Sequence, residues 1–256
     1  MTAGTIIVTG ASRGIGRSTV YQAIQHFQCN VIGVARSQDH LESLAKDEDL
    51  KDRFKYVVGD VADEKVFRQA VELAKSSWSG ELHGLVLNAA VLEPIAPIAE
   101  SSDADWKRLF DINFFSLVTA ARIALPALRE TKGRIIIVGS NASRVAIKGW
   151  GAYCTSKCAT NMLAEILSIE EKDVVSVLVD PGVVDTAMQG VIREQGAESM
   201  GEFHNEFMIL HQQGLLKHAD APAYILANMA LNAKPDISGK YVPYDDPAIV
   251  SQYGKK

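Results

Sequence analysis

The chain has 256 residues, of which 47% are hydrophobic and 22% are charged. This composition can bury the core of one large α/β domain or two small ones, and it excludes an intrinsically disordered chain. The formal net charge is −5 and the basic residues are scattered, which excludes a basic surface for nucleic acid or an anionic membrane. We therefore expect a small-molecule partner, no nucleic acid and no membrane.

Targeting signals and metal ligands bear on the compartment and on cofactors. The opening MTAGTIIVTG lacks the features of a signal peptide, and no stretch reaches about 18 uninterrupted apolar residues. The cysteines match neither a disulfide framework nor a zinc-ligand pattern. His204, His211 and His218 would lie about 10 Å apart along a helix, which is too far to share one metal ion. We expect a cytoplasmic protein without a bound metal.

Short runs rich in β-branched residues alternate along the chain with stretches of helical apolar spacing. Near-continuous apolar strands indicate a parallel sheet covered by helices on both faces, because only such burial tolerates strands without a polar side. No Pro-, Gly- or Ser-rich linker divides the chain. We predict an α/β fold, a single doubly wound Rossmann-type domain (1–256), whose seven parallel strands lie at 5–9, 30–35, 55–59, 82–88, 134–139, 174–180 and 239–244.

The first predicted strand is followed by TGASRGIG, residues 9–16, and then by a helical pattern. In such a sheet the ligand lies outside the carboxyl ends of the strands. Gly10 permits a tight turn, Gly14 lets backbone amides approach a pyrophosphate, and Gly16 allows close helix–strand packing. The spacing differs from G-x-G-x-x-G, and a glycine-rich turn in an ordinary βα unit is the alternative. The order of strand, loop and helix favours a dinucleotide.

The end of the second strand indicates which dinucleotide is bound. An Asp or Glu there would bind the adenosine ribose 2′-hydroxyl, whereas an Arg would accommodate a 2′-phosphate. Arg36 stands at this point and Arg13 lies inside the glycine loop, while Asp39 comes too late to be a ribose ligand. A guanidinium binds phosphate bidentately, so the two arginines favour NADPH over NADH. Solvated surface arginines are the alternative.

Three polar residues after the fifth strand suit carbonyl reduction. Ser140 follows that strand, and Tyr153 and Lys157 lie four residues apart in the next helical stretch. Hydride transfer to a carbonyl leaves negative charge on oxygen, so the site needs a proton donor and a second hydrogen bond. We expect the ammonium of Lys157 to lower the pKa of Tyr153. Cys154 and Cys158 share another helix face, where they are poorly placed for a disulfide, and we interpret them as packing residues.

Together these motifs resemble the short-chain dehydrogenase/reductase family over essentially the whole chain. The resemblance is carried by TGASRGIG, Asp60-Val61, NAA at 88–90, DINFFS, Ser140, YCTSK and PGVVDT. It implies a catalytic tetrad in which Asn113 holds a water that relays protons to Lys157, Ser140 polarises the carbonyl and Tyr153 is the acid/base. Two departures lie near the nicotinamide: LNAA (87–90) stands where the family has N-N-A-G, and Gly139 where it often has a serine.

The resemblance also implies an NADP(H) site. Asp60 and Val61 would contact adenine, and Thr186 with the Pro181-Gly182 turn would hold the carboxamide. The expected cofactor-binding residues are Gly10, Ser12, Arg13, Gly14, Ile15, Gly16, Arg36, Ser37, Asp60, Val61, Asn88, Ala89, Tyr153, Lys157, Pro181, Gly182, Val184 and Thr186.

Within the family, GVARS, VLEPIAPI, DINFFSLV, GWGAY and PGVVDTAMQ resemble fungal and bacterial carbonyl reductases related to sepiapterin reductase and to the benzil reductase that forms (S)-benzoin. This implies NADPH-dependent reduction of a small aromatic or dicarbonyl compound. A 3-oxoacyl-type ketoreductase and a non-catalytic NADPH-binding sensor or scaffold are the alternatives. The expected substrate residues, each of which could instead be ordinary core, are Leu92, Glu93, Val145, Trp150, Val183 and Met188.

Residues 186–214 are punctuated by four glycines. We interpret this segment as a substrate lid that excludes water, with a fixed helical insertion as the alternative. The family resemblance further implies a homodimer or homotetramer that packs through the helices after strands four and five.

Overall fold

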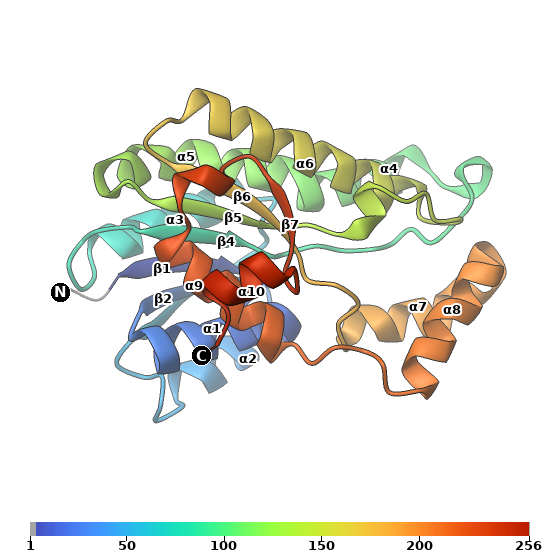
Figure 1. Cartoon of the computed structure of the whole chain (residues 1–256), viewed down its shortest axis with the longest axis horizontal. Coiled ribbons are helices and arrows are strands. Elements are labelled where there is room, and N and C mark those ends of the chain that lie inside the picture. Colours follow the sequence, from blue (N-terminus) through green and yellow to red (C-terminus); the bar gives the residue numbers. More distant parts are fainter. Residues whose placement is uncertain (1–3, 256) are drawn as a thin grey trace.

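The computed structural model describes residues 4–255 and confirms the predicted fold class (Figure 1). Seven parallel strands form one sheet in the order β3-β2-β1-β4-β5-β6-β7. Each strand falls on one of the predicted runs. The strands are β1 (Thr5–Thr9), β2 (Asn30–Ala35), β3 (Phe54–Val58), β4 (Gly84–Leu87), β5 (Arg134–Val138), β6 (Val175–Asp180) and β7 (Tyr241–Pro243).

The central strands are buried on both faces, as their apolar sequences predict. All five residues of β1 are buried, and Ile6 and Val8 lie in one core cluster whereas Ile7 lies in the other. Successive side chains of a strand point to opposite faces of the sheet, so this division shows a hydrophobic core on each side. Each fully buried aliphatic side chain stabilises the fold by about 1.5–3 kcal/mol.

Helices cover both faces of the sheet (Figure 1). Val20 of α1 and Leu226 of α9 belong to the first core cluster, whereas Phe67 of α3 and Leu117 of α5 belong to the second. The helices are α1 (Gly14–Phe27), α2 (Gln38–Ala45), α3 (Glu64–Lys75), α4 (Asp103–Phe110), α5 (Ser116–Thr131), α6 (Gly151–Glu170), α7 (Ala187–Met200), α8 (Glu202–Gln212), α9 (Asp220–Asn232) and α10 (Pro247–Tyr253).

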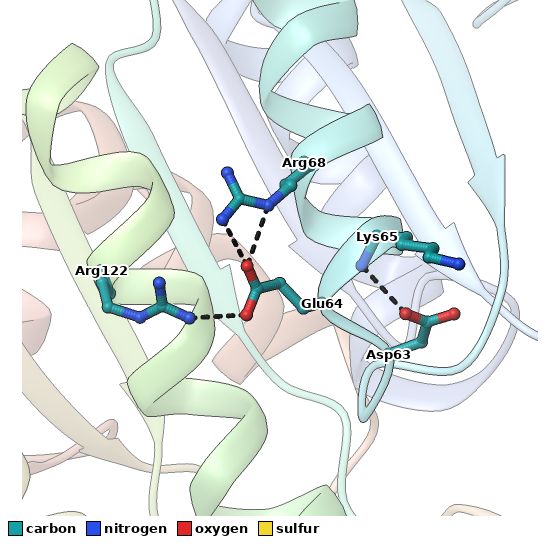
Figure 2. A network of polar contacts seen from close by, with 5 residues as sticks. All are labelled: Asp63, Glu64, Lys65, Arg68 and Arg122. Atoms are coloured by element: carbon teal, nitrogen blue, oxygen red, sulfur yellow. Dashed lines mark hydrogen bonds and ion pairs between the residues drawn. The ribbon is translucent and has the colours of Figure 1, made fainter.

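A surface network of polar contacts joins α3 to α5 (Figure 2). Asp63 caps α3 by accepting a hydrogen bond from the backbone nitrogen of Lys65 at 2.9 Å. Glu64 pairs with Arg122 of α5 at 2.7 Å and with Arg68 one turn further along α3. Hydrogen bonds from Arg122 and Arg68 hold the pKa of Glu64 below its usual range. Exposed ion pairs contribute little stability. The network therefore orients α3 relative to α5, and the buried apolar side chains supply most of the stabilisation.

The strand order reverses at β1, which has β2 on one side and β4 on the other. Thr9 ends β1, and its hydroxyl accepts hydrogen bonds from the backbone nitrogens of Asn88 at 2.9 Å and Ala89 at 3.0 Å. The Asn88 amide donates to the backbone oxygen of Thr9 at 2.8 Å. These bonds fix the two loops that diverge at the switch point, where a doubly wound sheet binds its ligand.

The segment 186–214 forms two helices, α7 and α8, which meet at Gly201 with a φ of +60°. Figure 1 shows them standing apart from the helices that cover the sheet. α7 buries Ile192 and Met200 in a third apolar cluster, which also contains Trp150 and Tyr153. The segment is therefore helical and packs against the start of α6, and its movement as a lid stays a prediction.

One helical stretch, residues 103–131, is long and apolar enough to cross a membrane by length and composition, with a mean hydropathy of 1.3. It comprises α4, a π-helical turn (Asp111–Phe115) and α5. Leu117, Ala124 and Leu128 of α5 are buried in the second core cluster. A core helix of a globular protein meets the same criterion, and the packing of these residues identifies this stretch as one.

Candidate active site

A cavity of about 400 Å³ lies at the carboxyl ends of the strands. Its wall is built from the segments that follow β1, β2, β3, β4, β5 and β6. Every predicted cofactor residue except Gly16 lines this cavity, and so do Ser140, Tyr153 and Lys157. The fold thus brings the glycine loop and three of the four predicted catalytic residues to one place.

The glycine loop has the shape that a pyrophosphate requires. Gly10 and Gly14 have φ values of +68° and +54°, in the left-handed region that favours glycine. A Cβ on Gly16 would lie 2.3 Å from the Gly10 carbonyl oxygen, so Gly16 serves close packing of α1 instead of lining the cavity. A Cβ on Gly14 would enter the cavity and come within 3.2 Å of Thr186. The first turn of α1 has no acidic residue, and its free amides suit a dinucleotide phosphate.

The nucleotide end of the cavity carries exposed charges. Arg13 and Arg36 are exposed and line it. Asp60 accepts a hydrogen bond from the Ala62 backbone nitrogen at 2.9 Å and pairs with Arg108 of α4. Burial alone would raise the pKa of Asp60, but the Ala62 amide and Arg108 outweigh it and hold that pKa below its usual range. The charge of Arg36 also lowers the pKa of Asp60, so this carboxylate partly offsets the positive charge at the rim, where Arg13 and Arg36 line the cavity.

The catalytic end of the cavity is buried. Tyr153 and Lys157 lie one turn apart on α6 and are 6% and 4% exposed. The Lys157 Nζ lies 5.6 Å from the centroid of the Tyr153 ring and donates a hydrogen bond to the Val138 carbonyl oxygen at 2.8 Å. Ser140 follows β5, and its Oγ accepts a hydrogen bond from the Ala142 backbone nitrogen at 3.1 Å. The end of β5 thus positions the hydroxyl of Ser140 and the ammonium of Lys157 beside the phenol.

Burial dominates the titration of this pair. It raises the pKa of Tyr153 to about 12, against an opposing hydrogen bond from Ser140. The expected net lowering of the Tyr153 pKa is therefore not found in this structure, because desolvation penalises the phenolate more than the Ser140 hydrogen bond stabilises it. Burial also lowers the pKa of Lys157 to about 8. At neutral pH the phenol is consequently a neutral proton donor next to a mostly charged ammonium.

Asn113 is the one predicted catalytic residue that does not line the cavity. It lies in the π-helical turn and is 1% exposed. Its Oδ1 accepts a hydrogen bond from the Val91 backbone nitrogen at 2.9 Å, and its Nδ2 donates to the Val91 carbonyl at 2.8 Å and to Ser156 Oγ at 3.3 Å. The side chain therefore joins the loop after β4 to α6, and the predicted water relay at this residue stays a prediction.

Asp180 is a buried acid near the catalytic pair that the sequence analysis did not single out. Its Oδ1 accepts a hydrogen bond from the Gly182 backbone nitrogen at 2.9 Å, and its Oδ2 accepts one from the Tyr241 hydroxyl. Burial is the larger cause of the raised pKa of Tyr153 and of the lowered pKa of Lys157. The negative charge of Asp180 is a smaller cause that raises the pKa of both groups. An acidic residue between a buried strand and Pro-Gly was the available sequence signal.

Three of the predicted substrate residues line the cavity, namely Leu92, Glu93 and Met188. Val91, Gln189 and Val191 also line it, although the sequence analysis did not select them. Leu92, Val91 and Met188 pack in the same apolar cluster as Tyr153, while Glu93 and Gln189 add a carboxylate and an amide to the cavity wall.

The other three predicted substrate residues, Val145, Trp150 and Val183, are not in the cavity wall. Trp150 is buried behind Tyr153, with their ring centroids 5.6 Å apart, and its indole nitrogen lies 3.2 Å from the Met200 sulfur. Val145 is 44% exposed at the surface. The proximity of these residues in the sequence to Tyr153 or to the Pro-Gly turn did not determine which way each side chain points.

Comparisons with known proteins agree with this geometry. Residues 4–197 match the family described as short chain dehydrogenase. The chain is 43% identical over 248 residues to the uncharacterized oxidoreductase YIR035C of Saccharomyces cerevisiae, covering 95% of this chain and 96% of the relative. The crystal structure of YIR035C superposes with a TM-score of 0.93 at 42% identity, covering 97% of this chain and 99% of that one.

A curated yeast relative and a solved yeast structure each share 40% identity with the chain. The benzil reductase ((S)-benzoin forming) IRC24 of Saccharomyces cerevisiae is 40% identical over 253 residues, covering 94% of this chain and 95% of the relative. The crystal structure of a protein described as cytoplasmic and of unknown function, also from Saccharomyces cerevisiae, has a TM-score of 0.82 at 40% identity. It covers 97% of this chain and 99% of that one.

The seven-stranded parallel sheet and the cavity at its carboxyl ends define a doubly wound α/β domain with a ligand site at the switch point. With the family match, the chain belongs to the short-chain dehydrogenase/reductase family, whose members use a nicotinamide cofactor. The suspected likeness to benzil reductases is confirmed at the level of sequence.

Proposed function

We propose that this chain is an NADPH-dependent carbonyl reductase that reduces a ketone of a small aromatic or dicarbonyl compound, with Tyr153 as the general acid. The observation that carries the proposal is that Ser140, Tyr153 and Lys157 line the same cavity as the glycine loop. That arrangement supports the proposal, because a dinucleotide held by the loop would present its reactive end to a cavity that contains a proton donor.

The chain's own residues then handle the charge and the proton. The hydride for the carbonyl carbon would come from a nicotinamide dinucleotide when one is bound. Negative charge develops on the carbonyl oxygen, and Tyr153, protonated at neutral pH because its pKa is about 12, donates its hydroxyl proton there. The hydroxyl of Ser140 donates a second hydrogen bond to the same oxygen. The ammonium of Lys157, charged below its pKa of about 8, stabilises the phenolate that remains.

The choice of NADPH over NADH rests on Arg13 and Arg36, which lie in the wall at the nucleotide end. Guanidinium groups pair with a phosphate through charge-assisted hydrogen bonds worth about 1.5–3 kcal/mol each. Asp60 is paired with Arg108 and also interacts with the charge of Arg36, so it offsets only part of the positive charge at this end. A 2′-phosphate therefore gains contacts that a 2′-hydroxyl cannot make.

The substrate class follows from the wall next to Tyr153 and from a relative. Leu92, Met188 and Val191 provide apolar contacts suited to an aromatic group. The relative IRC24 is a benzil reductase that forms (S)-benzoin, so its substrate is an aromatic dicarbonyl. These observations favour a compound of that kind over an acyl thioester.

We also propose a homodimer or homotetramer in the cytoplasm. Met162, Ile166 and Ile169 of α6 are 54%, 41% and 67% exposed and share one helix face, and Phe115 beside α5 is 53% exposed. Large apolar side chains gathered on one face of a soluble protein are typical of a subunit interface. For the compartment, the yeast relative described as cytoplasmic supports the proposal.

The proposed function is tested by measuring coenzyme consumption with NADPH or NADH and three carbonyl compounds: benzil, an aromatic monoketone and a 3-oxoacyl thioester. We expect kcat/KM to be highest with benzil and at least about tenfold higher with NADPH than with NADH. Faster turnover of the thioester would favour the 3-oxoacyl ketoreductase. A chain that binds NADPH and reduces none of the three would contradict the proposal and favour the sensor.

A further inference from the structure

Gln189 places a buried amide in the cavity wall that the mechanism above does not use. It lies near the start of α7, lines the cavity and is 6% exposed. Its Oε1 atom is buried and has no hydrogen-bond partner among residues 4–255. Leaving a buried acceptor unpaired is costly, so an orphaned amide in the wall of a ligand cavity points to a polar group of the ligand.

The sequence offers this amide a local partner that the structure does not use. Residues 186–189, Thr-Ala-Met-Gln, have the T-x-x-Q pattern of a capping box, in which the two side chains bond each other's backbone amides. Thr186 is the N-cap of α7 but makes no side-chain cap hydrogen bond, and Gln189 Oε1 accepts none. Both side chains line the cavity instead. The usual structural role of this pattern therefore does not account for Gln189.

The position of Gln189 on α7 indicates that its amide lies at the substrate end of the cavity. The buried residues of α7 are Gln189, Ile192, Gly196 and Met200. Ile192 and Met200 belong to the apolar cluster that contains Tyr153 and Leu92. Gln189 is thus the polar first member of the helix face that packs against the catalytic helix.

We propose that Gln189 determines substrate specificity by hydrogen-bonding a second oxygen next to the reacting carbonyl, selecting 1,2-dicarbonyl and α-hydroxy carbonyl compounds over simple ketones. This inference rests on the proposed carbonyl reductase function and narrows its substrate class. The Nε2 atom of Gln189 would donate to the second carbonyl oxygen of a dicarbonyl compound, whereas the unpaired Oε1 atom would accept from the hydroxyl of an α-hydroxy carbonyl compound. Glu93, the carboxylate at this end of the cavity, only accepts when ionised, so it cannot replace the amide opposite a ketone.

A structural role through a neighbour is the competing explanation. Arg193, one turn further along α7, has a buried Nη1 atom that also lacks a partner among residues 4–255. One water could bridge the Gln189 oxygen and the Arg193 nitrogen without any ligand. Such a bridge would affect stability but not the choice between two ketones.

The test compares Gln189→Leu with wild type on benzil and on deoxybenzoin, which lacks the second carbonyl oxygen. The quantity measured is kcat/KM for benzil divided by kcat/KM for deoxybenzoin. A diketone is intrinsically more reactive, but this difference is the same for wild type and variant, so it cancels when their two ratios are compared. A site built around a hydrogen bond rejects the analogue that lacks it, since the polar group is then left unpaired. We expect the preference for benzil to fall about tenfold in the variant, with the Kd for NADPH unchanged.

Gln195→Leu, the same substitution at an exposed position of α7, is the matched control and should keep the wild-type ratio. Gln189→Met replaces Gln189→Leu if the latter does not fold. An unchanged ratio in the Gln189 variant overturns the inference. If that variant also binds NADPH more weakly than wild type, the amide serves the cofactor. If instead its Tm is lower than that of wild type, the amide serves Arg193. Wild type that reduces both ketones with a ratio insensitive to Gln189 leaves the proposed function intact. Wild type that reduces neither ketone removes the function and the inference together.

Discussion

The nucleotide end of the cavity carries exposed cationic side chains, whereas the catalytic end carries a buried phenol beside a buried ammonium. Arg13 and Arg36 stand in solvent, while Tyr153 and Lys157 are less than one tenth exposed. Exposed charges are screened by salt and by water, so they act mainly on the affinity for a charged ligand. Buried titratable groups have shifted pKa values, so they act on the chemical step and its pH dependence. Substitutions at the two ends should therefore change different kinetic quantities.

Replacing the acid at the catalytic end should have the largest effect. Tyr153→Phe removes the donated proton and keeps the ring, and we expect kcat for ketone reduction to fall about 100- to 10,000-fold. The Kd for NADPH, measured by fluorescence titration, should stay within about twofold because the nucleotide end is untouched. Tyr224→Phe on α9, outside the cavity wall, is the control with wild-type turnover. A Tyr153→Phe enzyme that retains wild-type kcat would remove the phenol from the mechanism.

Removing both exposed cations should weaken the nucleotide end selectively. In Arg13→Ala/Arg36→Ala we expect the Kd for NADPH to rise about 10- to 100-fold, because two charge-assisted contacts to the 2′-phosphate are lost. The Kd for NADH and the kcat should change little, and the salt dependence of NADPH binding should become weaker. Arg17→Ala, whose guanidinium lies over the Tyr21 ring and not in the cavity wall, is the control. Equal weakening for NADH would show that these arginines do not read the 2′-phosphate.

The pH profile should report the buried pair. Lys157 is charged below its pKa of about 8, and Tyr153 stays protonated up to its pKa of about 12. The kcat for reduction should therefore fall as pH rises above about 8, about tenfold per pH unit well beyond the pKa. In Asp180→Asn the loss of a negative charge that raises the pKa of Lys157 should move this fall to lower pH. If kcat falls only near pH 12, or falls at the same pH in Asp180→Asn as in wild type, the pH dependence does not come from Lys157.

The smallest effect is expected at the two thiols that flank the catalytic residues. The Cys154 Sγ contacts the Val145 carbonyl at 3.8 Å, and the Cys158 Sγ donates to the Ser143 carbonyl at 3.0 Å. Neither thiol lines the cavity. We expect Cys154→Ala/Cys158→Ala to retain kcat within about twofold and to lower Tm by no more than about 2–4 °C in a thermal scan. Abolished turnover in this folded variant would assign chemistry to a thiol.

The elements that could be predicted from the sequence depend on local spacing. The strands can be predicted because the runs at 5–9 and 134–139 contain uninterrupted apolar residues (6–8 and 135–138), which would face both sides of the sheet and which only a covered parallel sheet tolerates. The glycine loop, Ser140 and Tyr153 all stand at fixed offsets from a strand end or along one helix. The parallel topology then carries all of them to the same edge of the sheet.

The features that the sequence did not reveal depend on burial and side-chain direction. The pKa of Tyr153 rises because the folded chain removes water from it, which the Lys157 spacing alone does not show. Trp150 was expected in the substrate site and packs behind Tyr153 instead. Gln189 reads as part of a capping box, and only the three-dimensional structure shows its amide unpartnered in the cavity wall.

Transfer of label from NADPH deuterated at the hydride-donating carbon of its nicotinamide ring shows whether the chain reduces a ketone with Tyr153 as the acid. The protein is incubated with this coenzyme and benzil, and the alcohol product is analysed by mass spectrometry. The account predicts deuterium at the new carbinol carbon with wild type and about 100-fold less labelled product, or lower, with Tyr153→Phe under the same conditions. Tight NADPH binding without labelled alcohol, or equal labelling by the two proteins, would contradict it.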